Sequence, residues 1–359
     1  ILLFSKYDLC DKEETLKWKN YYETLGYTVI LSELNDNKVK NKIIDAVNIL
    51  MEKVNLKRKE KGLLPKKAKV MVVGVSNVGK STLINTIINR KVAITSNVSG
   101  TTRNIIQGIY NDTDTQIVFV DTPGIHKPIN RLGKVLNKEA LALTKDVDLI
   151  LFVVDVASGI GKGDMFILES LKNNDVPVIL VLNKIDEITT EKLFKTIDEF
   201  KDIYPFVEVV PTSGLKNDNV DHLISVIKKY LHDEVKYFPD EYYTSSSMKF
   251  MASEIVREKL LQVTEDEIPH SITCITTLFE EKKDIVNISV DIIVDRDNIK
   301  RIIIGKNGSR LKMVGTLART EIESELVGKK VYLELFVKTI KNWKDKEKYL
   351  VELGFIDNE

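Results

Sequence analysis

One run of eight residues, Gly74–Ser81, constrains this chain more than any other feature. Its sequence fits G-x-x-x-x-G-K-[ST], the pattern of loops that wrap nucleotide phosphates. The apolar run Val70–Val73 precedes it and the apolar-periodic stretch 82–88 follows it, so strand, loop and helix come in the required order. Glycines let successive N–H groups point at phosphate oxygens, and the helix N-terminus adds partial positive charge. We therefore predict a phosphate-binding loop, in which Lys80 reaches the β- and γ-phosphates and Ser81 offers its hydroxyl to Mg²⁺.

Three motifs downstream predict that the base is guanine. Asp121–Gly124 is a D-x-x-G sequence at the end of an apolar run, with the aspartate expected near Mg²⁺ and the glycine near the γ-phosphate. Asn183–Asp186 is an N-K-x-D sequence at the end of another such run. A carboxylate there can accept two hydrogen bonds from the N1–H and N2–H₂ edge of guanine, which adenine lacks. Ser213–Gly214 is placed to contact the base from the other side. All of these motifs end strand-like runs, so the set predicts a GTP site.

The C-terminal part contains a further motif, which indicates RNA. From Met248 the pattern predicts a helix, two strands, two helices and a strand, with alternating apolar and polar residues over 286–294 and 331–338. Between those two strands, Gly305–Gly308 matches the GXXG loop that clamps about four nucleotides of a single strand. Every charged residue from Asn298 to Thr320 is basic. We interpret the acidic residues elsewhere in this domain as a solvated face. The residues expected to contact RNA are Gly305, Lys306, Asn307, Gly308, Arg310 and Lys312.

Composition narrows the class of protein without indicating a partner. Lysine plus arginine and aspartate plus glutamate number 53 each, so the bulk charge is zero. Cys10 and Cys274 are the only cysteines, which excludes a disulfide framework, and we interpret both as buried or half-buried thiols. No uninterrupted apolar stretch approaches the roughly 20 residues of a membrane span. These features are typical of an intracellular protein.

Residues from about 68 to 359 resemble the Era family of GTPases, which join a Ras-like GTP-binding domain to a KH-type RNA-binding domain. Thr101-Thr102-Arg103 resembles the first switch of that family, with Thr102 matching the threonine that closes on Mg²⁺ in the GTP state. Residues 121–128 resemble the second switch, and 237–239 with 250–260 resemble the connection into the C-terminal domain. Ser245-Ser246 departs from the family, whose members usually carry an acidic and a basic residue there. That departure puts one linker contact in doubt.

The resemblance implies a fold, a division of the chain and a set of site residues. We expect an α/β Ras-like P-loop GTPase domain over 68–234 and an α+β type II KH domain over 235–359, after a βαβα appendage over 1–67. The expected catalytic residues are Lys80, Thr102 and Gly124, and the expected Mg²⁺ ligands are Ser81, Thr102 and Asp121. The residues expected to bind the nucleotide are Asn77, Val78, Gly79, Lys80, Ser81, Thr82, Asp121, Gly124, Asn183, Lys184, Asp186, Ser213 and Gly214.

The resemblance also implies slow GTP hydrolysis. Ras orients the attacking water with a glutamine, but the residue after Asp121–Gly124 is Ile125, which cannot do this. Asn77 resembles the residue that coordinates K⁺ in several relatives, and K⁺ would supply positive charge at that point. His126 is more typical of a structural or solvent-facing residue than of a catalytic one.

The function implied is a switch that binds small-subunit ribosomal RNA near its 3′ end and assists assembly of the small ribosomal subunit. The resemblance further implies a monomer in the cytoplasm, partly associated with membranes at their periphery. Two alternatives are a GTP-liganded RNA-binding module without significant turnover and a large-subunit assembly factor directed by the N-terminal segment.

The first 67 residues do not fit the Era family. Phe4–Leu9 resembles a second base-recognition loop with Ser5 in place of the asparagine. Residues 27–33 resemble the strand and loop that follow such a loop, and residues 39–61 are typical of a helix. This order resembles the upstream half of a circularly permuted GTPase of the YlqF (RbgA) type, a family that acts in large-subunit assembly. The sequence holds two candidate base-recognition loops and one phosphate loop, so only one of the two can complete the nucleotide site. A serine cannot replace both functions of an asparagine amide. We therefore favour Asn183–Asp186 as the base loop.

Several interpretations of the N-terminal segment stay open. Two strands seldom hold a core alone, which favours an appendage without a function of its own. An engineered fusion, a sequence-assembly artefact and a basic helix that contacts RNA are the alternatives.

Overall fold

The computed structural model describes residues 2–4, 11–24, 29–31, 68–113, 115–125, 128–172, 174–231, 238–265, 267–326 and 328–356. The chain divides into two compact units, Ile1–Lys66 and Lys67–Glu359. In the first unit, β1 (Leu2–Phe4) pairs in parallel with β2 (Val29–Leu31), and α1 (Lys12–Thr24) connects them. The predicted strand–helix–strand order is therefore present. The expected helix over 39–61 and the loop that contains Ser5 lie outside the described residues.

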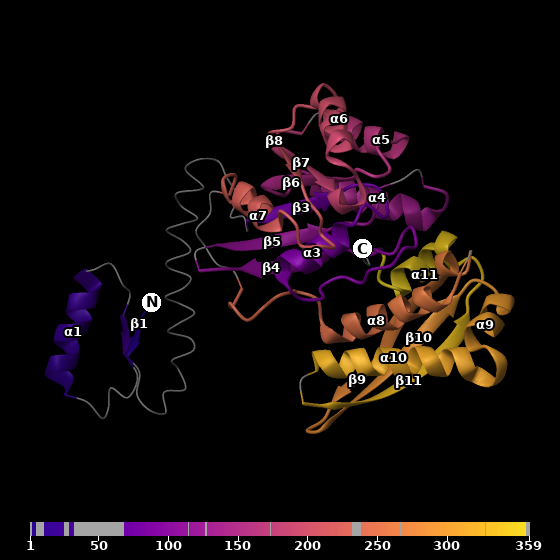
Figure 1. Cartoon of the computed structure of the whole chain (residues 1–359). Helices are drawn as coiled ribbons and strands as arrows, with labels where there is room; N and C mark the ends of the chain where they lie inside the picture. The colour runs from indigo at the N-terminus through magenta and orange to yellow at the C-terminus, as the bar shows by residue number, and fades with distance from the viewer. Residues whose placement is uncertain are drawn as a thin grey trace. The chain divides into compact units, whose positions relative to one another are not determined.

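The second unit begins with a six-stranded sheet, in the order β4-β5-β3-β6-β7-β8 (Figure 1). Its strands are β3 (Lys69–Val73), β4 (Ile106–Asn111), β5 (Gln116–Asp121), β6 (Leu149–Asp155), β7 (Val178–Asn183) and β8 (Glu208–Pro211). All neighbours pair in parallel except β4, which is antiparallel to β5. The carboxyl ends of parallel strands meet at one edge, which is where ligands bind in open α/β sheets. The phosphate loop, Asp121 and Asn183 all stand at that edge.

Helices cover both faces of this sheet. They are α3 (Lys80–Ile88), α4 (Arg131–Leu143), α5 (Lys162–Leu171), α6 (Thr190–Lys201) and α7 (Val220–Lys228). The helices α3 and α7 share one core with Val70 and Val72 of β3. Met71 and Val73 pack on the other face with α4, α5 and α6. Successive strand residues point to opposite faces, so a strand buried on both sides is apolar throughout. The burial of both faces is why the apolar run Val70–Val73 indicates a strand in the sequence.

The rest of the second unit has the element order predicted from Met248. The elements are α8 (Met248–Val263), β9 (Ile272–Glu281), β10 (Ile285–Val294), α9 (Asp297–Ile304), α10 (Ser309–Glu325) and β11 (Lys330–Thr339). Short 3₁₀ turns cover Pro269–Ser271, Lys306–Gly308 and Trp343–Asp345, and α11 (Glu347–Glu352) follows. The sheet order is β11-β10-β9, with β11 parallel and β9 antiparallel to β10. Figure 1 shows α8, α9 and α10 on this sheet, and all three contribute to one core with β10. The expected Ras-like P-loop and KH folds are thus both confirmed.

The segment between the two sheets runs along β4. The expected domain boundary at 234/235 lies outside the described residues, but residues 238–246 are described. Tyr243 O accepts a hydrogen bond from Ile109 N at 2.9 Å, and Ser245 N donates to Gln107 O at 3.3 Å. Ser245 Oγ also lies 3.1 Å from Gln107 Oε1. Ser245, the first serine of the pair that departs from the family pattern, therefore contacts β4, and the linker covers an edge that would otherwise be open to pairing.

The interpretation of the acidic residues as a solvated face is wrong for the start of this domain. Glu254 is 4% exposed and Glu258 is 2% exposed. Glu254 pairs with Arg257 on the same helix, whereas Glu258 accepts a hydrogen bond from Lys91 of the other domain. A partner that is distant in the sequence leaves no local pattern.

No helix among the described residues is long and apolar enough to cross a membrane.

Candidate functional sites

The phosphate-binding loop requires glycine at both ends. A Cβ on Gly74 would lie 2.3 Å from Val153 O, and one on Gly79 would lie 2.4 Å from Asn183 Nδ2. Gly79 also has a φ of 90°, a left-handed conformation that favours glycine. Lys80 is 6% exposed, and its Nζ donates to Gly74 O at 3.0 Å and Val75 O at 2.9 Å. Burial lowers the pKa of Lys80 to about 8, although Asp121 and Asp164 oppose this shift.

Three oxygen-bearing side chains meet beside this loop. Ser81 Oγ donates to Asp121 Oδ2 at 2.7 Å and lies 3.1 Å from Thr102 Oγ1. Asp121 is fully buried, and its Oδ1 has no hydrogen-bond partner among the described residues. Burial raises the pKa of Asp121 against the opposing effects of Lys80 and Ser81. Mg²⁺ prefers oxygen ligands and commonly takes one or two from side chains, with phosphates and water completing the shell. The residues present therefore fit Mg²⁺.

Asn183 joins the expected base loop to the phosphate loop. Its Nδ2 donates to Val78 O at 2.8 Å, and its Oδ1 accepts a hydrogen bond from Gly214 N at 3.0 Å. Lys184 has a φ of 67°, and its Nζ contacts Asp155 Oδ2 at 2.7 Å. Asp186 follows in a short 3₁₀ turn, Ile185–Glu187, and its side chain is exposed. The asparagine thus fixes three loops against one another, and the aspartate is left facing outward.

Most of the predicted nucleotide-site residues line one cavity of about 400 Å³. Those lining it are Asn77, Gly79, Lys80, Ser81, Thr82, Thr102, Gly124, Asn183, Lys184 and Asp186. Val78, Asp121, Ser213 and Gly214 are buried behind this wall. Val78 and Gly214 are hydrogen-bonded to Asn183, and Asp121 to Ser81, whereas Ser213 Oγ accepts a hydrogen bond from Lys216 N. The volume is within the usual range of small-molecule pockets, roughly 300–1,000 Å³. Ile125 is fully buried in the core and is not part of the cavity wall.

Sequence reasoning missed several residues at this site, among them Leu215 and Asp164. Leu215 lines the cavity with 71% of its surface exposed, and its position directly after Ser213–Gly214 could have identified it. Asp164, in the first turn of α5, is buried, and the negative charge of its carboxylate opposes the lowering of the Lys80 pKa. No local pattern marks Asp164, because it approaches the phosphate loop only through the fold.

The GXXG loop is a tight connection between α9 and α10. Gly305, Asn307 and Gly308 have φ values of 73°, 51° and 76°. A Cβ on Gly305 would lie 2.9 Å from Arg310 Cβ, whereas one on Gly308 would meet nothing within 4 Å. Backbone at Gly308 is therefore open to an approaching ligand.

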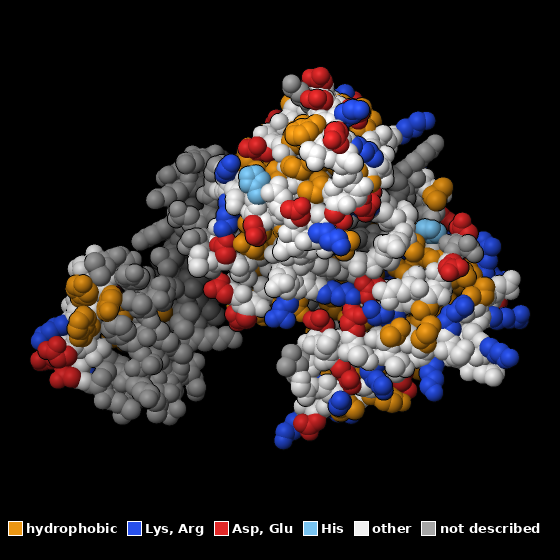
Figure 2. Space-filling view, viewed as in Figure 1, with side chains coloured by type: hydrophobic (Ala, Val, Ile, Leu, Met, Phe, Trp, Pro, Cys, Tyr) orange, Lys and Arg blue, Asp and Glu red, His pale blue; other side chains and the backbone are white. Residues whose placement is uncertain are grey.

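A groove of about 540 Å³ runs from this loop between α10 and β11. Gly308 and Lys312 line it, as expected, whereas Gly305, Lys306 and Asn307 form the loop at its end. Arg310 instead donates from Nη1 to Ile302 O at 2.8 Å. Residues lining the groove that were not predicted are Leu311, Gly315, Thr316, Arg319, Val331, Tyr332, Leu333 and Leu335. Figure 2 shows lysine and arginine side chains gathered where α9 meets the start of α10.

Two known protein families match the parts of the chain that contain these two candidate sites. Residues 69–184 match the family described as 50S ribosome-binding GTPase. Residues 267–344 match the family described as KH domain. The fold and the sites together define a P-loop GTPase joined to an RNA-binding KH domain.

Two solved structures of Era match most of the chain. One is a tyrosine-to-alanine variant of Aquifex aeolicus Era bound to GDP and AlF₄⁻. The other is Era in complex with MgGDPNP and nucleotides 1506–1542 of 16S ribosomal RNA. Each is 39% identical to this chain with a TM-score of 0.78, and the match covers 81% of this chain and 99% of the other. This chain therefore belongs to the Era family of GTPases.

Proposed function

We propose that this GTPase is a slow switch that binds small-subunit ribosomal RNA near its 3′ end and assists assembly of the small ribosomal subunit. The observation that carries the proposal is that a guanine-type nucleotide site and a KH groove lie in one compact unit, residues 67–359. The Era complex with a 16S ribosomal RNA fragment supports the choice of RNA. We assign 68–234 to nucleotide binding and 235–359 to RNA binding, with 1–67 as a separate segment.

The positions of the side chains suggest their roles in the nucleotide site. Lys80 holds the β- and γ-phosphates. Its ammonium then gives up the hydrogen bonds to Gly74 O and Val75 O, and hydrogen bonds to charged phosphate oxygens offset that loss. Ser81, Thr102 and Asp121 hold Mg²⁺, which neutralises charge on the phosphates when it is bound. A Cβ on Gly124 would lie 2.5 Å from Ser76 Oγ, so the second switch rests against the phosphate loop, where it can respond to a γ-phosphate.

The remaining predicted residues read the base or surround it. Asp186 accepts the N1–H and N2–H₂ hydrogen bonds of guanine, and Asn183 keeps the base loop in register with the phosphate loop. Ser213, Gly214 and Leu215 approach the base from the opposite side. The backbone N–H groups of Asn77–Thr82 surround the phosphates.

One feature supports slow intrinsic hydrolysis, and a second supports a role for K⁺. Ile125 is buried, so the position after the D-x-x-G sequence offers no polar group to orient water. Asn77 Nδ2 donates to Asn97 O at 2.9 Å, an orientation that leaves the amide oxygen for a cation such as K⁺. Measuring turnover in K⁺ and in Na⁺ tests that assignment.

Co-sedimentation with separated ribosomal subunits tests the proposed target. With a non-hydrolysable GTP analogue, we expect the protein to pellet with the small subunit and to stay at background with the large one. The reverse result would support the alternative that the N-terminal segment directs the protein to the large subunit. Flotation with lipid vesicles tests the proposed peripheral membrane association, and sedimentation analysis tests the monomer.

Deleting residues 1–66 is expected to leave a folded protein that binds GTP and RNA. All six strands of the nucleotide-binding sheet come from residues 69–211, so that sheet needs no strand from the N-terminal unit. We expect the melting temperature to change by only a few degrees, the effect of about 1 kcal/mol in a domain of this size. Scanning calorimetry and nucleotide titration of the truncated and full-length proteins measure this. Aggregation of the truncated protein, or loss of its GTP binding, would contradict the expectation.

A further inference from the structure

The segment Thr95–Arg103, called the switch I segment here, contains the proposed Mg²⁺ ligand Thr102. At its N-terminal end, Thr95 N donates to Glu258 Oε1 of α8 at 3.0 Å. At its C-terminal end, Arg103 reaches the start of the KH domain. Both ends of the segment are therefore attached to the RNA-binding domain, although the segment belongs to the nucleotide-binding one.

Arg103 makes the more specific of these two attachments. Its guanidinium donates from Nη1 to Ile272 O at 2.5 Å and from Nη2 to Pro269 O at 3.2 Å. It also lies 6.0 Å from the ring centroid of Trp343, which is fully buried. Only 7% of Arg103 is exposed. A planar guanidinium holds its N–H donors in a rigid fork, whereas a lysine ammonium rotates on a flexible stem and fixes no direction.

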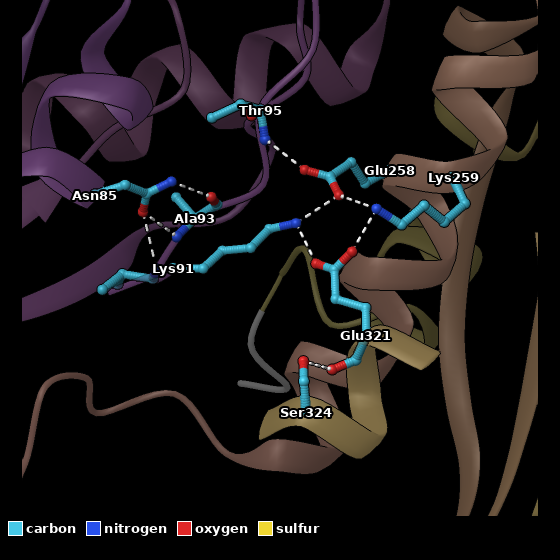
Figure 3. Close-up of polar contacts among 9 residues, drawn as sticks. Asn85, Lys91, Ala93, Thr95, Glu258, Lys259, Glu321 and Ser324 are labelled. Atoms are coloured by element: carbon cyan, nitrogen blue, oxygen red, sulfur yellow. Dashed lines mark hydrogen bonds and ion pairs between the residues drawn. The ribbon is translucent and has the colours of Figure 1, made fainter. Parts of the chain in front are cut away.

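The opposite end is held by a cluster of charges (Figure 3). Lys91 Nζ pairs with Glu258 of α8 at 2.5 Å and with Glu321 of α10. Lys259 pairs with the same two carboxylates, at 3.0 Å for Glu258. Glu258 is 2% exposed, so water screens these interactions less than it would on an open surface. The cluster therefore fixes the residues just before the switch I segment on α8 and α10.

Thr102 lies between these attachments and directly beside Arg103. Consecutive Cα atoms are about 3.8 Å apart, so a shift of the arginine backbone is passed on to the threonine. Thr102 Oγ1 lies only 3.1 Å from Ser81 Oγ, so a displacement of about 1 Å would remove it from the ligand set. Losses of this kind commonly cost about 100-fold in an active site.

We propose that Arg103 is a positioning residue, which holds Thr102 at the Mg²⁺ and γ-phosphate site by docking onto the backbone of the KH domain. This inference rests on the proposed function of Thr102. It assigns to the KH domain a part in nucleotide discrimination, in addition to RNA binding. Glu321 lies on α10, and other residues of the same helix, among them Gly315 and Arg319, line the groove between α10 and β11.

The test compares the affinity of a non-hydrolysable GTP analogue with that of GDP, both in Mg²⁺, by titration calorimetry. For Arg103→Ala we expect analogue affinity to fall at least 10-fold and GDP affinity to change less than 2-fold, because only the analogue carries a γ-phosphate. Arg103→Lys keeps a cation and is the safer variant for folding, and we expect the same selective loss. Hydrogen exchange of the amides over 95–103 should become faster in both variants.

Two further variants make the result decisive. Arg131→Ala removes another contact between the domains, the 2.5 Å pair with Glu347, far along the chain from the switch I segment. We expect it to leave both affinities unchanged. Thr102→Ala should reproduce the selective loss. If Thr102→Ala has no such effect, the proposed role of Thr102 fails. If Thr102→Ala shows the loss but both Arg103 variants bind the analogue and GDP as the unchanged protein does, or lose both equally, the positioning role of Arg103 is overturned.

Discussion

Replacing Asp186 by asparagine is expected to convert the site from guanine to xanthine nucleotides. The Asp186 side chain is exposed at the wall of the cavity, and Asn183 holds its loop against the phosphate loop through Val78 O. A carboxylate accepts both guanine hydrogen bonds, whereas an amide offers one acceptor and one donor. Xanthine carries a carbonyl where guanine carries the N2 amine, so the amide donor suits it.

The expected change in affinity is large because the lost interactions involve a charge. Hydrogen bonds to charged groups contribute about 1.5–3 kcal/mol each, so GTP affinity should fall roughly 100-fold or more. Titration of GTP and XTP against the variant measures both effects. Asp8→Asn is the control, since it alters the second loop that resembles a base-recognition sequence. Loss of GTP binding in that variant, with the Asp186 variant intact, would show that the other loop reads the base.

Local patterns in the sequence were enough to predict which residues the fold brings together at the candidate nucleotide site. Val70–Val73 is apolar throughout because both faces of β3 are buried, and the phosphate loop follows directly from that strand. Asp121 and Asn183 each end a strand, so their convergence follows from the parallel sheet. The hydrogen bond from Asn183 to Val78 joins residues 105 positions apart, and its existence could be anticipated only through the motif.

Contacts between the two domains could not be predicted in this way. Arg103 resembles an ordinary basic residue of a switch loop, yet it is buried because Ile272 and Pro269 offer it carbonyls 169 and 166 positions away. Glu258 is one of two acids on α8, and its burial is explained by Lys91, Lys259 and the amide of Thr95. The groove between α10 and β11 shows the same limit, since Tyr332 and Leu335 come from a strand beyond α10. Such residues acquire their surroundings from the packing of distant segments.

Replacing Gly308 by aspartate is expected to abolish most single-stranded RNA binding while leaving GTP affinity nearly unchanged. Gly308 lines the groove directly before the start of α10, and an added side chain would enter open space instead of striking the protein. A carboxylate there would stand where a phosphate is expected to approach the main chain, and like charges repel. We expect RNA affinity to fall at least 10-fold. The nucleotide site is in the other domain and should be insensitive to the change.

A matched control separates an effect at the groove from the backbone strain and charge that the substitution adds at any such glycine. Gly354 has a φ of 75°, almost the same as the 76° of Gly308, and a Cβ there also meets nothing within 4 Å. It lies after α11 and outside the groove lining, so Gly354→Asp adds the same strain and charge away from the groove. Fluorescence anisotropy with a short single-stranded RNA, at several salt concentrations, compares the two variants. RNA affinity equal in both would remove the groove between α10 and β11 as the RNA site, because only Gly308 lies in it.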